Sequence, residues 1–122
     1  MLTERRDYLL RLIQQAGAAA RRLRELLSKE GADVDGVAGE AETAIGALLG
    51  GGAQSQLLER VDADTAVRLV GDRERVRLWV DLLEAQADAL NRQGHTEQGR
   101  RIRERAGALA AALDRLADSL GS

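Results

Sequence analysis

Two amphipathic helical patterns that meet at Gly94 constrain this chain more than any other feature. Between Val76 and Leu113, apolar residues recur at spacings of three and four on both sides of that glycine. Such spacing places each set along one face of a helix. Gly94 stands where a helix commonly ends in a left-handed residue. The pattern therefore predicts a helical hairpin that the rest of the chain covers. Its two apolar stripes are Trp79, Val80, Leu83, Ala87 and Leu90, and Ile102, Ala106, Leu109, Leu113 and Leu116.

The same periodicity upstream predicts further helices. Either Asp33 or Asp35 is placed to cap the second of them. Asp62 and Asp64 stand at the start of a short helix, where carboxylates complement the helix dipole, and Val67, Leu69 and Val70 are expected on its buried side. We therefore expect one helical domain, 1–122, composed of an N-terminal hairpin (3–49), a Gly-rich loop (50–54), short helices (55–70) and a C-terminal hairpin (72–120).

The composition favours an all-α fold of about four main helices and two short ones, packed as hairpins in a bundle. Aromatic residues make up only 2% of the chain and proline is absent. The core must therefore be built from Leu, Val, Ile and Ala, which suits closely packed helices. No run approaches the roughly 18 apolar residues of a membrane span. The charged N-terminus does not resemble a signal peptide, so we expect a cytoplasmic protein without a membrane partner.

The chain lacks the residues that most kinds of catalytic site require. The chain has no cysteine, and His95 is its single histidine, so no cofactor or metal site is expected. The paired carboxylates stand mostly at helix starts, where capping explains them better than acid–base catalysis. We expect His95 to be a turn residue, Trp79 to be a core residue and Tyr8 to lie at the core edge. No catalytic residue is assigned.

Two arginine clusters are the remaining charged feature. They are Arg21, Arg22 and Arg24, and Arg100, Arg101, Arg103 and Arg105. Acids are interleaved with both clusters and the formal net charge is −2, whereas a nucleic-acid-binding protein usually has a basic surface. Solvated helix faces are therefore the favoured interpretation, and nucleic-acid binding is the alternative.

The stretch 80–113 resembles a tetratricopeptide (TPR) repeat. Its large apolar, small and turn positions are occupied in the register of that repeat by Leu83, Ala87, Leu90, Gly94 and Ala106. The chain departs from the pattern in three ways: Gly99 stands where alanine is usual, Arg103 stands where an aromatic residue or leucine is usual, and no proline closes the unit.

The resemblance also indicates a candidate interaction face. In TPR repeats the first helix holds a partner segment through positions that correspond here to Asp81, Glu84, Asp88 and Asn91. These four residues recur at spacings of three and four and form a polar stripe. Their acidity favours a basic partner segment, although an ordinary solvated face has the same pattern.

The whole chain resembles a family of small, uncharacterised bacterial all-helical proteins. The specific part of the likeness is the N-terminal helix Asp7-Tyr8-Leu9-Leu10-Arg11-Leu12-Ile13, and Leu48-Leu49-Gly50 and the TPR-like hairpin continue it. The resemblance implies the helical fold and brings no activity with it.

Together these patterns predict a protein–protein interaction module or a self-assembling helical module, with homodimerisation a reasonable expectation because the aromatic-poor core is thin. A nucleic-acid-associated protein that uses the arginine clusters is the alternative, and binding that weakens steeply with salt would distinguish it. An enzyme is the third reading, and it would require a pocket with convergent polar groups.

Overall fold

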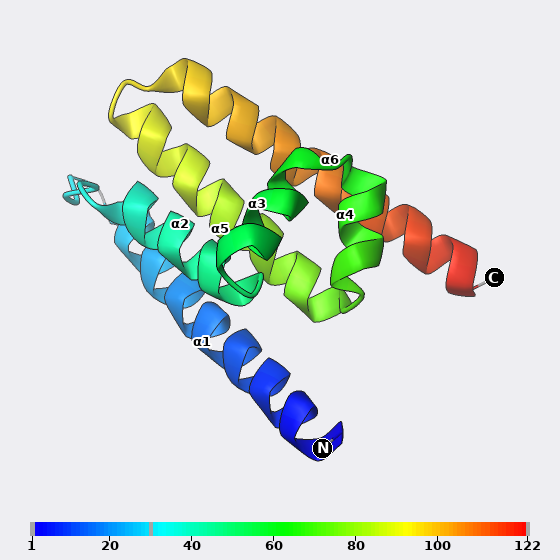
Figure 1. The fold of residues 1–122 in the computed structure, drawn as a ribbon. Coiled ribbons are helices and arrows are strands. Elements are labelled where there is room, and N and C mark those ends of the chain that lie inside the picture. Colours follow the sequence, from blue (N-terminus) through cyan, green and yellow to red (C-terminus); the bar gives the residue numbers. More distant parts are fainter. Residues whose placement is uncertain (1, 30, 122) are drawn as a thin grey trace.

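The computed structural model describes the backbone of residues 2–29 and 31–121, and the side chains of 4–29 and 31–119. Within these ranges the fold is all-α, as the composition predicted, and has six helices and no strand. In chain order the helices are α1 (Leu2–Ser28), α2 (Val37–Leu48), α3 (Gly52–Arg60), α4 (Ala63–Val70), α5 (Arg73–Arg92) and α6 (Thr96–Gly121). They form two antiparallel hairpins, α1–α2 and α5–α6, with the short helices α3 and α4 beside them (Figure 1).

Helix α5 is the centre of the molecule because α1, α2, α4 and α6 all contact it. Trp79 is 1% exposed, which confirms it as a core residue. The stripe predicted from sequence is buried, and Val76, Leu82 and Ala89 are buried as well, so α5 has apolar contacts on more than one side. A helix buried on several sides can organise a core that has almost no aromatic residues.

The turn between α5 and α6 has the geometry that Gly94 predicted. Its φ is 87°, a left-handed conformation that glycine adopts without a steric penalty. The backbone N–H of His95 donates to the carbonyl of Leu90 at 2.8 Å, which is the closing bond of a Schellman motif. The two long helices therefore fold back on each other and make the most extensive helix pair of the molecule.

Aspartate side chains cap helices α4 and α5. The Asp62 side chain accepts from the backbone N–H of Thr65 at the start of α4, and Asp72 does the same for Arg75 at the start of α5. The hydrogen bonds from Thr65 hold the pKa of Asp62 below its usual value. Each cap satisfies a backbone donor that the first helical turn leaves unpaired.

Three local expectations are wrong. Helix α2 begins after Gly36 without a side-chain cap, because Asp33 instead accepts from the backbone N–H of Asp35 in the preceding loop. Helix α3 begins at Gly52, earlier than the expected start at 55, so the Gly-rich loop is shorter than 50–54. Leu69 is 55% exposed, because α4 presents Ala66 and Val67 to the core.

Candidate interaction groove

Three carboxylates of the predicted polar stripe face a groove between α1 and α5. Asp81 and Asp88 are half-buried and Glu84 is exposed. With residues of α1 and α6 they line a hollow of about 470 Å³. The other residues that line it are Ala20, Arg24, Leu27, Ser28, Ala85 and Arg103. The three-and-four spacing thus correctly predicted that these carboxylates share one face of α5. The sequence did not indicate that α1 would lie opposite them.

The hollow continues along α1 in both directions. Toward the N-terminus, Ala20, Arg24 and Asp81 also line a second hollow of about 320 Å³, whose other walls include Gly17 and Leu78. Toward the α1–α2 loop, Leu27 and Ser28 are shared with a third hollow of about 420 Å³. The result is one extended groove with small or apolar residues between charged walls.

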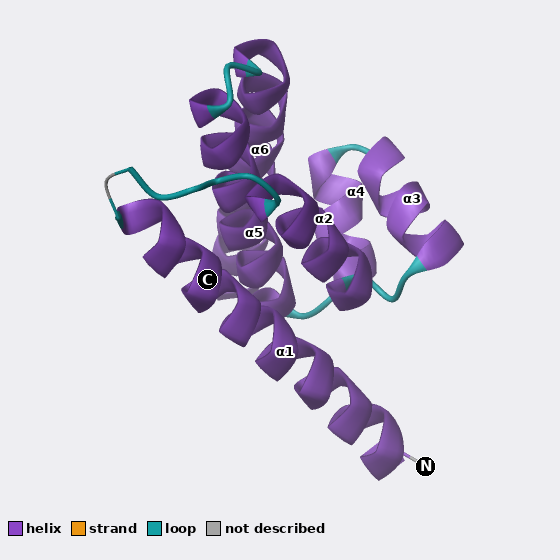
Figure 2. Cartoon of the chain, turned by 90° about the vertical axis from the view of Figure 1, so that its left-hand side faces the viewer, coloured by secondary structure: helices purple, strands orange, loops and turns teal. Residues whose placement is uncertain are grey.

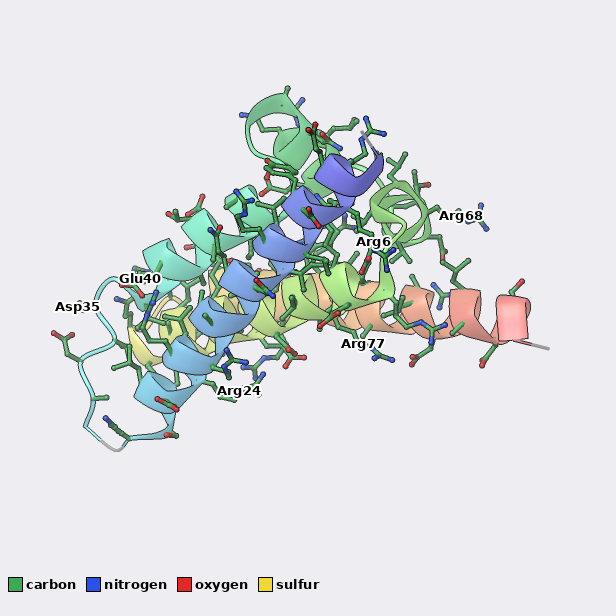
Figure 3. All side chains as sticks on the ribbon, turned by 90° about the horizontal axis from the view of Figure 1, so that it is seen from below. Arg6, Arg24, Asp35, Glu40, Arg68 and Arg77 are labelled. Carbon is green, nitrogen blue, oxygen red and sulfur yellow. The ribbon has the colours of Figure 1, made fainter. Side chains whose placement is uncertain are left out.

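Arginines neutralise two of the three carboxylates within the chain. Arg24 Nη2 of α1 lies 3.4 Å from Asp81 Oδ2 across the groove, and Arg92 Nη2 lies 3.2 Å from Asp88 Oδ2 on α5 itself. Figure 3 shows Arg24 on one side of α1 and Glu40 of α2 on the other, so the helix separates these two charged surfaces. Within the described residues, Glu84 and Arg103 have no ion pair. The face expected to be acidic is therefore of mixed charge.

Asn91, the fourth predicted residue, lies elsewhere. It is half-buried, and a Cβ atom at position 99 would overlap its side-chain oxygen. The glycine at position 99, where a TPR repeat usually has alanine, thus leaves room for Asn91 between α5 and α6. Asn91 packs within the C-terminal hairpin and does not line the groove hollow that the three carboxylates share.

Other residues singled out from the sequence lie outside the groove. His95 is exposed in the α5–α6 turn, and Tyr8 is 54% exposed on α1, beyond the core edge where it was expected. In the described part of the chain, no group of three or more His, Cys, Asp or Glu residues is placed to hold a metal ion. The described ranges also contain no buried side-chain polar atom that lacks a hydrogen-bond partner.

Most arginines of the two clusters pair with acids. Arg22 lies 3.5 Å from Glu40, and Arg100 and Arg101 both reach Glu97. The hydrogen bond from Arg100 holds the pKa of Glu97 below its usual value. These pairs are exposed, so each contributes little stability, but they reduce the positive potential of both clusters.

Three arginines have a role that sequence reasoning missed. Arg75 donates to the carbonyl of Leu48 at the end of α2, and Arg92 to that of Leu27 at the end of α1. Arg105 donates to the carbonyls of Leu58 and Val61 at the end of α3. The only available signal was indirect: neither α1 nor α2 has a basic residue in its last turn, so their free carbonyls need a donor from elsewhere.

Comparison with known proteins adds no relative. No protein-family model, curated protein or solved structure matches the chain. Among the described residues, no helix has the length and apolar character needed to cross a membrane.

Proposed function

We propose that this chain is a protein–protein interaction module that holds a partner segment in the groove between α1 and α5. The observation that carries the proposal is the placement of Asp81, Glu84 and Asp88 on one wall of an extended groove. An open groove between helices with apolar floor residues and polar walls is a common form of peptide-binding site.

The charges in the groove indicate which partner side chains fit. Asp81 and Asp88 already have arginine partners, whereas Glu84 and Arg103 line the same hollow without an ion pair in the described residues. A bound segment that places a basic side chain against Glu84 and an acidic one against Arg103 satisfies both. Small side chains fit over Ala20 and Ala85. The proposal thus keeps the basic partner residue predicted from the sequence and places it against Glu84.

The arginine pairing supports this proposal over nucleic-acid binding. A protein that binds phosphates needs arginines free to replace counterions. Here Arg22, Arg24 and Arg100 each lie beside a carboxylate. The chain also has only one Trp and one Tyr, and Trp79 is buried. Few aromatic side chains are therefore available to stack on nucleic-acid bases.

The test compares Glu84→Arg with Glu42→Arg, which makes the same charge change on an exposed residue of α2 that does not line the groove. Both variants and the wild type are used to capture proteins from cells, and the affinity of each captured partner is then measured with purified protein. We expect the Glu42 variant to bind the captured partner as tightly as the wild type does. The Glu84 variant should bind it at least about tenfold more weakly, as for a charged residue at an interface centre. Equal affinities for both variants would remove the groove as the binding site.

A further inference from the structure

Helix α3 lies at the outside of the bundle and buries little of its own surface. Figure 2 shows it at the right-hand edge of the molecule, on the outer side of α4. Seven of its nine residues are exposed, and the two buried ones are Ser55 and Leu58. Leu58 is thus the one large apolar side chain that α3 places in the core. Because so short a helix is not stable alone in water, α3 depends on what holds it from outside.

Both neighbours of α3 are closed by hydrogen bonds of their own. At the end of α2, the backbone N–H of Gly51 donates to the carbonyl of Gly46 at 2.7 Å, the longer bond of a Schellman motif. At the start of α4, the Asp62 side chain accepts from the backbone N–H of Thr65. Neither bond involves a residue of α3. The ends of α2 and α4 therefore remain complete when α3 leaves the bundle.

The chain that enters α3 is suited to act as a hinge. Gly51 and Gly52 have φ angles of 75° and 53°, in the left-handed region. Glycine adopts positive and negative φ about equally, so the backbone here changes direction without a steric penalty. No side chain caps the first turn of α3. This end of the helix is therefore held only by the short connection to α2.

The other end of α3 is held by one side chain of α6. Arg105 Nη2 donates to the carbonyls of Leu58 and Val61, both at 2.8 Å. Within the described residues, no other hydrogen bond or ion pair joins α3 to α5 or α6. The same guanidinium lies over the ring of Trp79. Arg105 thus acts as a latch, opposite the glycine hinge.

We propose that α3 is a flap that opens in the folded protein, with its hinge at Gly51 and Gly52 and its latch at Arg105. A segment with few buried side chains opens at a lower free energy than the whole fold. Once detached, α3 loses its helical hydrogen bonds because it is too short to keep them alone. Opening uncovers the site that Leu58 fills and removes both carbonyl partners of Arg105 beside Trp79. No residue of α3 lines the groove, so the flap does not depend on what the groove binds.

The first test is residue-resolved amide hydrogen exchange of the wild type and of Leu23→Ala. Leu23 is fully buried on α1, so truncating it lowers the stability of the whole fold. In the wild type, the hydrogen-bonded amides of α3 should exchange at least about 100-fold faster than the buried amides of α5, and faster than those of α4. Leu23→Ala should speed exchange in α5 and leave α3 unchanged, because α3 opens without global unfolding. Exchange of α3 at the rate of α4 or α5, or an equal rise in α3 and α5 in the variant, overturns the proposal.

The second test compares two neighbouring leucines of α3. Leu58→Ala removes the buried contact and should speed α3 exchange at least about tenfold. Leu57→Ala is the matched control, since Leu57 is 53% exposed, and it should change the rate by less than about threefold. Equal effects of the two changes would contradict the role of Leu58 in holding the flap closed.

Trypsin gives an independent readout on the wild type. Arg60 lies in the last turn of α3 and Arg68 in the last turn of α4, so two short helices carry the same cleavage site at the same place. If α3 opens and α4 does not, cleavage after Arg60 should be at least about tenfold faster than after Arg68. Mass spectrometry of the early fragments measures the two rates. Equal rates, or faster cleavage after Arg68, would overturn the proposal.

Discussion

The guanidinium carbon of Arg105 lies 5.8 Å from the centre of the Trp79 ring, so a cation from α6 rests on the largest buried side chain of α5. The same guanidinium donates 2.8 Å hydrogen bonds to the carbonyls of Leu58 and Val61. Partial burial lowers the pKa of Arg105, but an arginine remains charged at physiological pH. One side chain therefore connects α5, α6 and the end of α3. Within the described residues, the backbone of α3 lies close only to that of its sequence neighbours α2 and α4.

We expect Arg105→Ala to lower the free energy of unfolding by about 2–3 kcal/mol, because two charge-assisted hydrogen bonds to partly buried carbonyls are lost. Arg105→Met keeps much of the packing and should lose nearly as much. Trp79 is the single tryptophan, so denaturant unfolding followed by its fluorescence measures both changes. Hydrogen exchange should show the larger increase in α3. A methionine variant as stable as the wild type would mean that packing alone accounts for the contact.

Arg92 makes a similar connection between α5 and α1. Its Nη2 lies 2.6 Å from the carbonyl of Leu27 and 3.2 Å from Asp88. We expect Arg92→Ala to cost about 1–2 kcal/mol, since the last turn of α1 loses its charged donor. The Arg77 side chain on the same helix is exposed and has no hydrogen bond or ion pair within the described residues, so Arg77→Ala serves as the control. Equal stability of the two variants in urea would contradict this role.

Local patterns in the sequence were sufficient for the helices, the Gly94 turn and the burial of Trp79, because these depend on spacing along one segment. These patterns also placed Asp81, Glu84 and Asp88 on one face of a helix. They could not show that Arg24, far away in the chain, neutralises Asp81, or that Arg105 caps α3. Such pairs depend on which helix packs beside which, and periodicity carries no information about neighbours. Leu69 was misassigned for the same reason. Helix α4 has more apolar residues than the neighbouring helices cover, and Leu69 is one that stays exposed.

Gly99 is a position where alanine should destabilise the protein despite its higher helix propensity. A Cβ there would overlap the side chain of Asn91 and lie 3.0 Å from the carbonyl oxygen of Ala87. We expect Gly99→Ala to cost about 1–3 kcal/mol, as overpacking between two helices does. Gly107 lies on the same helix with open space around it, so Gly107→Ala should stabilise by about 0.5–1 kcal/mol. Adding Asn91→Ala to Gly99→Ala should restore only part of the loss, because the Ala87 carbonyl remains. Thermal unfolding of the four proteins tests these signs.

Asp62 should make the stability of α4 depend on pH. Its pKa is held below the usual 3.8, first by the hydrogen bond from the Thr65 hydroxyl and then by the Thr65 backbone N–H. A carboxyl whose pKa is lower in the folded state stabilises the fold above the unfolded pKa, and this stabilisation is lost as pH falls through the folded pKa.

Asp62→Ala should therefore lower Tm at about pH 7, and the difference from the wild type should shrink once the pH falls below the usual aspartate range. Asp62→Asn keeps a capping oxygen without a charge, so its Tm difference from Asp62→Ala should change little with pH. Thermal unfolding of the three proteins between about pH 7 and pH 2 makes the comparison. If the gap between wild type and Asp62→Ala stayed constant over that range, the Asp62 cap would act through its neutral hydrogen bonds alone.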